Sequence, residues 1–445
     1  MPNPLARTTR SSLLPLLVAA SLSACGNSGQ TGVSGRAVTT RYTIGGSVVG
    51  LTGTVVLLDN GVDDLSVTGS TAFTFSSALP TGTAYLSTVL KQPADVICTV
   101  AGGTGTVQAS DVTNIVISCG ARPPPVLESF AGDPAGAVGT AAKFTQPAGI
   151  ATDLAANVYV ADQGNNTILK ITPDGVVIDF AGTAGVTGSA DGMGPAATFN
   201  VPTSLAIDLA GNVFVTDTAN ELIRKITPAG KVSTLAGTVG ARGFSDGNGT
   251  AASFTLPYGA ATDRAGNLFV ADSAFCTLRK ISPAGDVSTP TGMALGARHD
   301  CTGSGGQLNG PFGLAVDLDG NIYVAHTPDQ VIIKITSTYA VSALAGTPGF
   351  PGSVDGIGTV ASFNSPLGVT TDSAGNVYVA DLLNETVRRI TPAGDVTTLA
   401  GVAGVTGFMP GALPGLLSHP RGVAISGTTL YITVDNGIVR IRNLP

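Results

Sequence analysis

Residues 366–400 read PLGVTTDSAGNVYVADLLNETVRRITPAGDVTTLA. Four short apolar runs rich in β-branched residues alternate with the turn sequences Ser-Ala-Gly-Asn and Pro-Ala-Gly. Glycine and asparagine adopt the positive φ that tight hairpins require. Strands of this length and composition, separated by such turns, predict a four-stranded antiparallel sheet.

The same pattern recurs from residue 127 onward with a period of about 55 residues. A four-stranded sheet repeated with no helices between the copies is typical of a β-propeller. The turns that begin the second strand lie near Asn157, Asn212, Asn267, Asn321 and Asn376, with a degenerate sixth unit at 428–434. The sequence therefore predicts six blades.

The sixth unit ends at 438–443 and lacks a fourth strand. An unassigned strand, Leu127–Ala131, precedes the first unit and matches the missing element. We expect the two to pair, because closing the ring removes exposed sheet edges.

The repeat consensus resembles the NHL repeat. It reads Pro-x-Gly-(Ile/Val)-Ala-x-Asp-x-x-Gly-Asn-(Val/Leu)-(Tyr/Phe)-Val-Ala-Asp-x-x-Asn-x-x-(Ile/Val)-Arg-(Lys/Arg)-Ile-Thr-Pro. The resemblance covers about residues 126–445 and implies a six-bladed propeller at 127–445. NHL propellers are sensor domains, protein- or RNA-binding platforms and occasionally lyases, so the resemblance favours a binding role by analogy.

A smaller β domain is expected before the propeller, at residues 42–120, followed by a Pro-rich linker at 121–126. Its short strands suit a small β-sandwich and resemble immunoglobulin-like modules of bacterial surface lipoproteins. An even cysteine count in an exported chain favours disulfides over metal ligands. We expect Cys98 and Cys119 to form one bond, worth about 3 kcal/mol for a loop of about 20 residues.

The first 25 residues look like an export signal. Arg7 and Arg10 precede an apolar run at 13–22 that is too short to span a bilayer, and Leu-Ser-Ala-Cys ends at Cys25. This segment resembles the lipobox of bacterial lipoproteins. It predicts a signal peptide at 1–24, acylation (palmitate included) of Cys25, and a tether at 25–41. Gly26 favours the outer over the inner membrane. Ordinary secretion with a chance cysteine is the alternative.

The overall charge disfavours nucleic acid as a partner. The formal net charge is −7 and becomes −9 once residues 1–24, with two arginines and no acid, are removed. No dense Lys/Arg patch is visible, so the surface would repel a phosphate backbone.

Two columns of aspartates recur from blade to blade. We interpret both as caps of neighbouring turns, and rings of metal ligands are the alternative. One column is Asp153, Asp208, Asp263, Asp317 and Asp372, and the other is Asp162, Asp217, Asp272 and Asp381.

The connections from the last strand of one blade to the first strand of the next are long and glycine-rich. They share one face of the propeller with the turns between second and third strands, and we call it the long-loop face. Binding is expected there. Phe199, Phe254 and Phe363 in these loops are expected to fill the gaps between blades.

The connection between the third and fourth blades is irregular and contains His299, Asp300 and Cys301. Cys301 is expected to form a disulfide with Cys276, which lies in the turn between the second and third strands of the preceding blade. The chain's three histidines and one aspartate near the long-loop face are candidate ligand-binding residues: His299, Asp300, His326 and His419. NHL-like peptidyl-α-hydroxyglycine lyases hold zinc with three histidines, but their other motifs are not matched here.

The sequence thus predicts an extracytoplasmic, lipid-anchored propeller that serves as a binding or scaffolding platform for a protein, peptide or small ligand. No catalytic residue and no cofactor are expected. The alternative is a metal-dependent enzyme of the lyase or lactonase type, using zinc or calcium, and a purely structural envelope role is a third reading.

Overall fold

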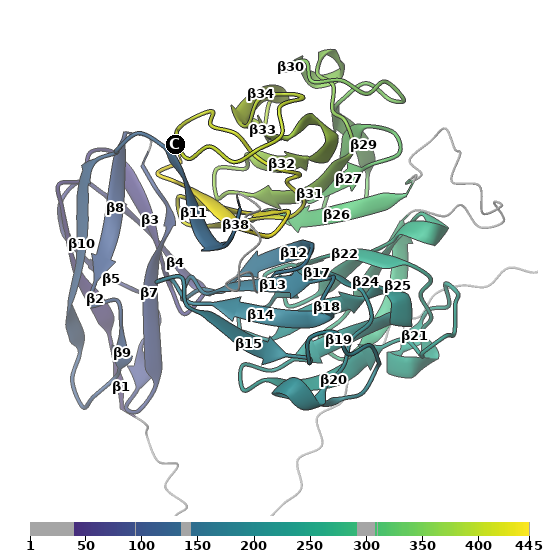
Figure 1. Cartoon of the computed structure of the whole chain (residues 1–445). Coiled ribbons are helices and arrows are strands. Elements are labelled where there is room, and N and C mark those ends of the chain that lie inside the picture. The colour runs from purple at the N-terminus through teal and green to yellow at the C-terminus, as the bar shows by residue number, and fades with distance from the viewer. Residues whose placement is uncertain (1–39, 94, 135–143, 292–307, 309, 445) are drawn as a thin grey trace, which may run out of the picture. The chain divides into compact units, whose positions relative to one another are not determined.

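The computed structural model describes residues 40–93, 95–134, 144–291, 308 and 310–444 (Figure 1). Within these ranges the regular elements are strands and 3-10 turns of three residues, which confirms the predicted all-β class. The turns are Gly194–Ala196, Thr218–Asn220, Gly249–Ala251, Ser273–Phe275, Gly358–Val360 and Leu382–Asn384. None of the helical segments described has the length and apolar character needed to cross a membrane.

The N-terminal β domain contains two four-stranded sheets whose buried side chains form one cluster that includes Ile44, Leu57 and Ile115. One sheet has the order β5 (Ala72–Thr74), β2 (Ile44–Val49), β10 (Val112–Ala121), β8 (Val96–Ala101). The other has the order β4 (Asp63–Thr68), β3 (Thr54–Asp59), β7 (Ala84–Lys91), β9 (Thr104–Thr106). Two short strands, β1 (Arg41–Tyr42) and β6 (Leu79–Pro80), form a separate pair.

A disulfide joins the two cysteines predicted to pair in this domain. Cys98 on β8 lies opposite Cys119 on β10 in the antiparallel register, and the sulfur atoms are 2.06 Å apart. The prediction is confirmed.

The C-terminal region forms six sheets in the described part of the chain, each starting from an inner strand. The first contains β12 (Pro147–Thr152), β13 (Val158–Asp162), β14 (Thr167–Ile171) and β15 (Val177–Ala181). The second contains β17 (Pro202–Ile207), β18 (Val213–Asp217), β19 (Leu222–Ile226), β20 (Lys231–Ala236) and β16 (Gly192–Met193). The third contains β22 (Pro257–Thr262), β23 (Leu268–Asp272), β24 (Thr277–Ile281), β25 (Asp286–Thr291) and β21 (Gly247–Asn248).

The remaining three sheets follow the same antiparallel order. The fourth contains β26 (Pro311–Val316), β27 (Ile322–His326), β28 (Val331–Ile335) and β29 (Val341–Ala345). The fifth contains β31 (Pro366–Thr371), β32 (Val377–Asp381), β33 (Thr386–Ile390), β34 (Asp395–Ala400) and β30 (Gly356–Ile357). The sixth contains β36 (Val423–Ser426), β37 (Thr429–Val434), β38 (Gly437–Arg442), β11 (Val126–Gly132) and β35 (Gly411–Ala412).

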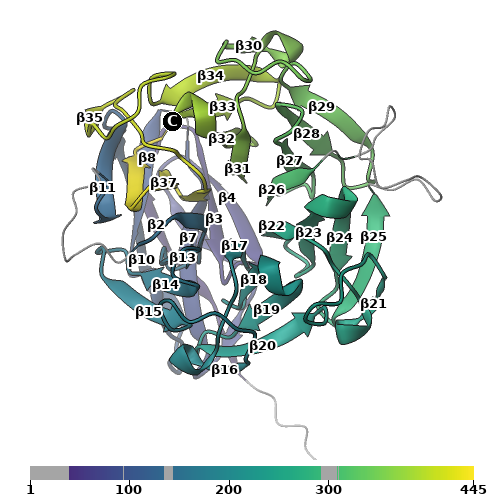
Figure 2. The same ribbon diagram turned by 45° about the vertical axis from the view of Figure 1, so that its right-hand side comes forward.

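These sheets surround a common centre. Figure 2 shows β17, β22, β26 and β31 toward the middle and β20, β25, β29 and β34 at the periphery. Each inner strand contacts the inner strand of the next sheet, and β12 also contacts β36, so the ring is closed. The propeller class predicted from the repeats is confirmed.

The ring closes through the strand that had no partner in the sequence pattern. β11 pairs antiparallel with β38, and Leu127 lies opposite Ile441. The first strand of the propeller thereby completes the sheet formed by the last three, which confirms the predicted pairing.

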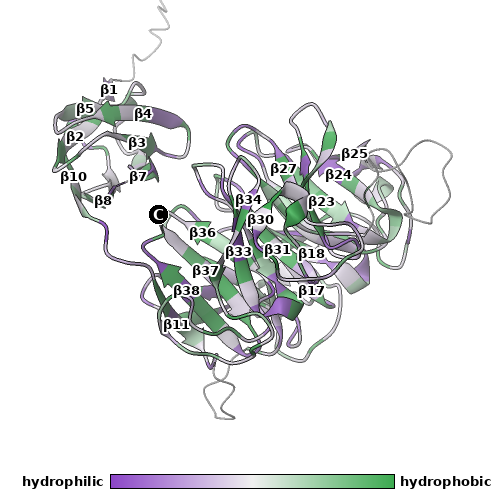
Figure 3. Cartoon of the chain, turned by 90° about the horizontal axis from the view of Figure 1, so that it is seen from above, coloured by the Kyte–Doolittle hydropathy of each residue, from purple (hydrophilic) through white to green (hydrophobic). Residues whose placement is uncertain are grey.

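Hydrophobic residues follow the strands, as the green colour of β37 and β38 in Figure 3 illustrates. The buried clusters join neighbouring sheets: one combines Tyr159 and Ala161 of the first sheet with Val213 and Val215 of the second. Three phenylalanines predicted to fill the gaps between blades are fully buried in such clusters: Phe199, Phe254 and Phe363. Their role as interblade plugs is confirmed.

Candidate functional site

The inner end of each sheet begins with a Pro-x-Gly segment, in which serine once replaces glycine. The six segments are 147–149, 202–204, 257–259, 311–313, 366–368 and 420–422. Because each segment directly follows a long connection, it lies at the end of the inner strand nearest the long-loop face. The segments therefore form a ring around the mouth of the central channel.

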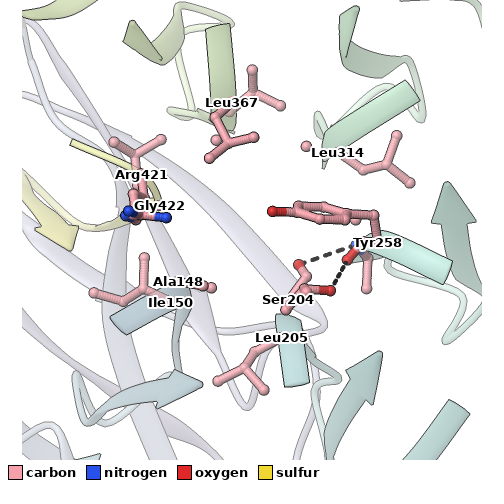
Figure 4. Close-up of a pocket in the computed structure, with 17 residues that line it drawn as sticks. Ala148, Ile150, Ser204, Leu205, Tyr258, Leu314, Leu367, Arg421 and Gly422 are labelled. Carbon is pink, nitrogen blue, oxygen red and sulfur yellow. Dashed lines mark hydrogen bonds between the residues drawn. The ribbon is translucent and has the colours of Figure 1, made fainter. Parts of the chain in front are cut away.

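The third position of the segment sets how closely the inner strands approach. A Cβ atom on Gly259 would overlap the carbonyl oxygen of Phe312, and one on Gly422 would overlap that of Ala148. Glycine is needed here because of this close approach of two backbones. Ser204 is the exception, and its Oγ accepts a hydrogen bond of 3.2 Å from the backbone N–H of Ala260 (Figure 4).

Hydroxyl groups on neighbouring second strands hold this ring in place. Thr433 Oγ1 donates to the carbonyl of Ala148 at 2.8 Å, and Thr216 Oγ1 donates to that of Tyr258 at 2.8 Å. These bonds run from one sheet to the inner strand of the next. The carbonyl groups of Ala148 and Tyr258 are thus satisfied by the protein itself.

The middle position of the segment differs in every blade. Ala148, Thr203, Tyr258, Phe312, Leu367 and Arg421 occupy it. A ring that is nearly symmetric in its backbone therefore presents two aromatic rings, two aliphatic groups, a hydroxyl and a cation. Five of these six residues, all except Phe312, line the cavity described next.

The segments enclose a cavity of about 60 Å³. We call this cavity and its lining the channel mouth (Figure 4). Its lining is Ala148, Gly149, Ile150, Thr203, Ser204, Leu205, Tyr258, Gly259, Ala260, Gly313, Leu314, Leu367, Gly368, Val369, Arg421, Gly422 and Val423. Arg421 is the one charged residue in this lining, so the channel mouth is cationic inside a chain of negative net charge.

Two side chains provide the polar chemistry of the channel mouth. The Tyr258 ring packs edge-on against Phe312 with centroids 4.5 Å apart, and its hydroxyl points across the channel toward the side where Arg421 lies (Figure 4). Burial raises the pKa of Tyr258, while the charge of Arg421 partly lowers it. At neutral pH the phenol is therefore protonated and able to donate a hydrogen bond.

The residues predicted as ligand-binding lie elsewhere. His299 and Asp300 fall outside the described residues. His326 ends β27, is buried, and has its Nδ1 3.5 Å from Asp329 Oδ2; burial lowers its pKa and Asp329 opposes this effect. His326 and His419 are not part of the channel-mouth lining.

His419 sits two residues before Arg421 and is held by two carboxylates. Its Nδ1 is 2.9 Å from Asp435 Oδ2, its Nε2 is 3.3 Å from Glu385 Oε1, and its backbone N–H donates to Glu385 Oε2. Across the residues that the structure describes, no three or more His, Cys, Asp or Glu side chains are grouped so as to hold a metal ion.

The two aspartate columns cap backbone, as expected. Asp153 accepts bonds of 2.8 Å from both the backbone N–H and the side-chain amide of Asn157 within its turn. Asp162 accepts from the N–H of Thr145 at 2.7 Å and from Asn165 at 2.7 Å. The capping interpretation is confirmed.

Burial raises the pKa values of Asp162, Asp272 and Asp381 to about 6 despite the hydrogen bonds that oppose it.

A column of buried arginines was not anticipated from the sequence. Arg224, Arg279 and Arg388 are fully buried, and each pairs with a capping aspartate and with the aspartate of an Asp-Gly loop. Each guanidinium also lies over a plug phenylalanine, at 5.3, 4.8 and 5.2 Å from the ring centroid. The loop residues Asp191, Asp246 and Asp355 are consequently engaged in holding the loops.

Only one of the two cysteines predicted to form the second disulfide lies within the described residues. Cys276 is buried and disulfide-bonded, whereas Cys301 lies outside the described residues. The pairing of Cys276 with Cys301 stays a prediction.

Comparison with known proteins identifies the propeller class. No protein-family model matches the chain. NHL repeat-containing protein 2 of Homo sapiens is 28% identical over 328 residues, which are 64% of this chain and 45% of that protein. Protein SUPPRESSOR OF QUENCHING 1, chloroplastic, of Arabidopsis thaliana is 28% identical over 320 residues, 67% of this chain and 30% of that protein. The chain spans less than half the length of these curated relatives.

Solved structures share both parts of the fold. A protein of unknown function from Bacteroides thetaiotaomicron matches with a TM-score of 0.56 and 18% identity, covering 87% of this chain and 90% of that chain. An auxiliary nutrient binding protein from Bacteroides ovatus matches with a TM-score of 0.53 and 16% identity over the same shares. At this identity the likeness concerns the fold. Taken with the repeats, these similarities support an NHL-repeat β-propeller.

Proposed function

We propose that this chain is a lipid-anchored binding protein of the bacterial cell envelope, and that its channel mouth binds a small organic ligand. The observation that carries the proposal is the channel mouth itself. Neighbouring blades contribute different side chains to it, and it combines apolar walls with a phenol and a guanidinium. A concave apolar site with a few polar groups is the usual form of a small-molecule site.

The fold neighbours support this choice. The auxiliary nutrient binding proteins from Bacteroides ovatus and Bacteroides thetaiotaomicron each match over 87% of the chain, which exceeds the length of the propeller alone. We infer a similar division of labour, in which the propeller binds the ligand and the N-terminal domain serves as a spacer. The lipid on Cys25 holds the chain at the membrane, with the outer membrane favoured over the inner.

A binding screen tests the proposed site. A panel of small sugars, amino acids, carboxylates and amides is tested on the full chain by thermal shift, and positive compounds are titrated by calorimetry. Ala148→Phe fills the channel mouth, and Leu367→Trp fills it independently from another blade. We expect at least one compound to bind the wild type and to lose binding in both variants. Binding that survives in folded forms of both variants would show that the ligand sits elsewhere, and no binding by any compound would contradict the proposal.

The anchor has its own test. Mass spectrometry of the N-terminal peptide from the native host should find an acylated Cys25. A Cys25→Ser variant should leave the membrane fraction, and an unmodified N-terminal peptide would refute lipidation.

A further inference from the structure

Arg421 differs from the other arginines of the described chain. Each of the other ten donates at least one side-chain hydrogen bond to a carboxylate, a carbonyl or an amide oxygen. Within the same described ranges, the Arg421 guanidinium has no such bond and no ion pair; its Nε is buried without a partner, as is the Nε of five other arginines. Its backbone N–H is satisfied by the carbonyl of Thr433, so the side chain alone is left over.

The surroundings of Arg421 make the lack of a protein partner for its guanidinium costly. No carboxylate lines the channel mouth, whereas six branched aliphatic side chains do: Ile150, Leu205, Leu314, Leu367, Val369 and Val423. A charge that is partly removed from water is normally paired. The three fully buried arginines of the same propeller follow that rule, since each has two aspartates.

Of the other polar groups of the lining, Thr203 is committed and Ser204 is partly so. Thr203 Oγ1 donates to the carbonyl of Tyr258 at 3.0 Å, and Ser204 Oγ accepts from the N–H of Ala260. The donors that remain for a ligand are the fork of Arg421, the hydroxyl of Tyr258 and the O–H of Ser204. Arg421 and Tyr258 lie on opposite sides of the channel mouth (Figure 4).

We propose that the channel mouth binds the carboxylate of a small monocarboxylic acid with an apolar chain. The Arg421 fork binds the two carboxylate oxygens, the Tyr258 hydroxyl donates to one of them, and the aliphatic walls hold the hydrocarbon chain. One cation balances one negative charge, whereas a phosphate dianion would leave a charge uncompensated and most of its oxygens without donors. A cavity of about 60 Å³ suits a carboxylate and a few carbon atoms. This assignment rests on the proposed function.

Calorimetric titration of the full chain with four probes tests the ligand class. The probes are butyrate, 3-methylbutanoate, the neutral isostere butyramide and inorganic phosphate. We expect both acids to bind and butyramide to bind at least about tenfold more weakly, because a hydrogen bond to a charged group is lost. Phosphate that binds as tightly as the acids would overturn the carboxylate assignment.

Variants locate the charge that is responsible. Arg421→Met keeps the length of the side chain and should weaken binding of the acids by about 10- to 150-fold, with little effect on butyramide. Arg421→Lys should restore part of that loss, and Tyr258→Phe should weaken binding of the acids by about two- to tenfold. The control Arg242→Met removes an arginine whose side chain is 69% exposed and does not line the channel mouth.

The outcomes separate this inference from the proposed function. Binding of neutral compounds that Ala148→Phe abolishes and Arg421→Met leaves unchanged would refute the carboxylate assignment and keep the channel mouth as the site. Absence of binding by every compound, charged or neutral, would overturn both.

Discussion

Replacing Arg388 with methionine should destabilise the propeller strongly. The guanidinium donates to Asp381 at 3.1 Å, to Asp355 at 2.6 Å and to the carbonyls of Ser362 and Val354 at 2.9 and 3.0 Å. All of these bonds are lost in Arg388→Met. The methionine keeps the apolar volume, so the change removes charge and hydrogen bonds more than packing.

The magnitude follows from what is left unpaired. Asp381 is fully buried, and without Arg388 it retains the N–H of Asn364 and the amide of Asn384, each at 2.7 Å. Breaking a buried ion pair from one side costs about 3–5 kcal/mol. We expect a value near the lower end, about 3 kcal/mol, because Asp381 keeps two donors.

The assay is urea unfolding at neutral pH, with the free energy of unfolding obtained by linear extrapolation. The double variant Arg388→Met/Asp381→Asn should recover part of the loss, since no buried charge is left alone. Arg442→Met is the control, because that side chain is 51% exposed and its partner Glu128 also binds Arg440; it should change stability by less than about 1 kcal/mol. A loss below about 1 kcal/mol in Arg388→Met, or no recovery in the double variant, would refute the reasoning.

Three further outcomes are expected. Because the folded pKa of Asp162 is about 6 and its ordinary value is 3.8, the wild type should lose up to about 3 kcal/mol relative to Asp162→Asn as the pH rises from about 4 to about 7; a wild type that keeps or gains stability relative to the variant over this range would contradict this. Gly422→Ala should lower the free energy of unfolding by at least about 2 kcal/mol, because the added Cβ would meet the backbone of the neighbouring strand. The control Gly120→Ala should have little effect, because the space around Gly120 is open. Similar losses in the two variants would be inconsistent with the close packing of the inner strands. Removing the Cys98–Cys119 bond, which closes a separation of 21 residues, should cost the N-terminal domain about 3 kcal/mol in thermal unfolding, and an unchanged melting temperature after reduction would count against it.

The fold was largely predictable because its information is local and repeated. Gly-Asn and Pro-Ala-Gly turns fix the hairpins, and the orphan strand at 127–131 matches the gap in the last unit.

The channel mouth was not predictable in the same way. Periodicity places Tyr258 and Arg421 at the same step of two repeats, but it does not show that the ring brings these positions to one cavity. A usable signal existed, because the middle residue of the Pro-x-Gly segment varies while its flanking residues repeat. The three histidines were candidates because histidine is rare in this sequence. In the structure, His419 is bound by Glu385 and Asp435.

The ion pairs of the buried arginines could not be predicted from the sequence either. The consensus contains the arginine of the third strand, and the loop aspartate is visible in the same units. Arg388 and Asp355 meet because the loop folds back over the interblade phenylalanine, a contact that neither local turn chemistry nor strand periodicity encodes.

The most direct test of the central claim is a methyl NMR spectrum of the full chain, with labelled isoleucine, leucine and valine, recorded with and without a millimolar mixture of small acids, amides and sugars. A ligand in the channel mouth should shift the methyl signals of its six labelled lining residues and leave those of Ile44 and Ile115 in the N-terminal domain unchanged. The six are Ile150, Leu205, Leu314, Leu367, Val369 and Val423. A spectrum that does not change, or shifts that avoid these six residues, would contradict the account.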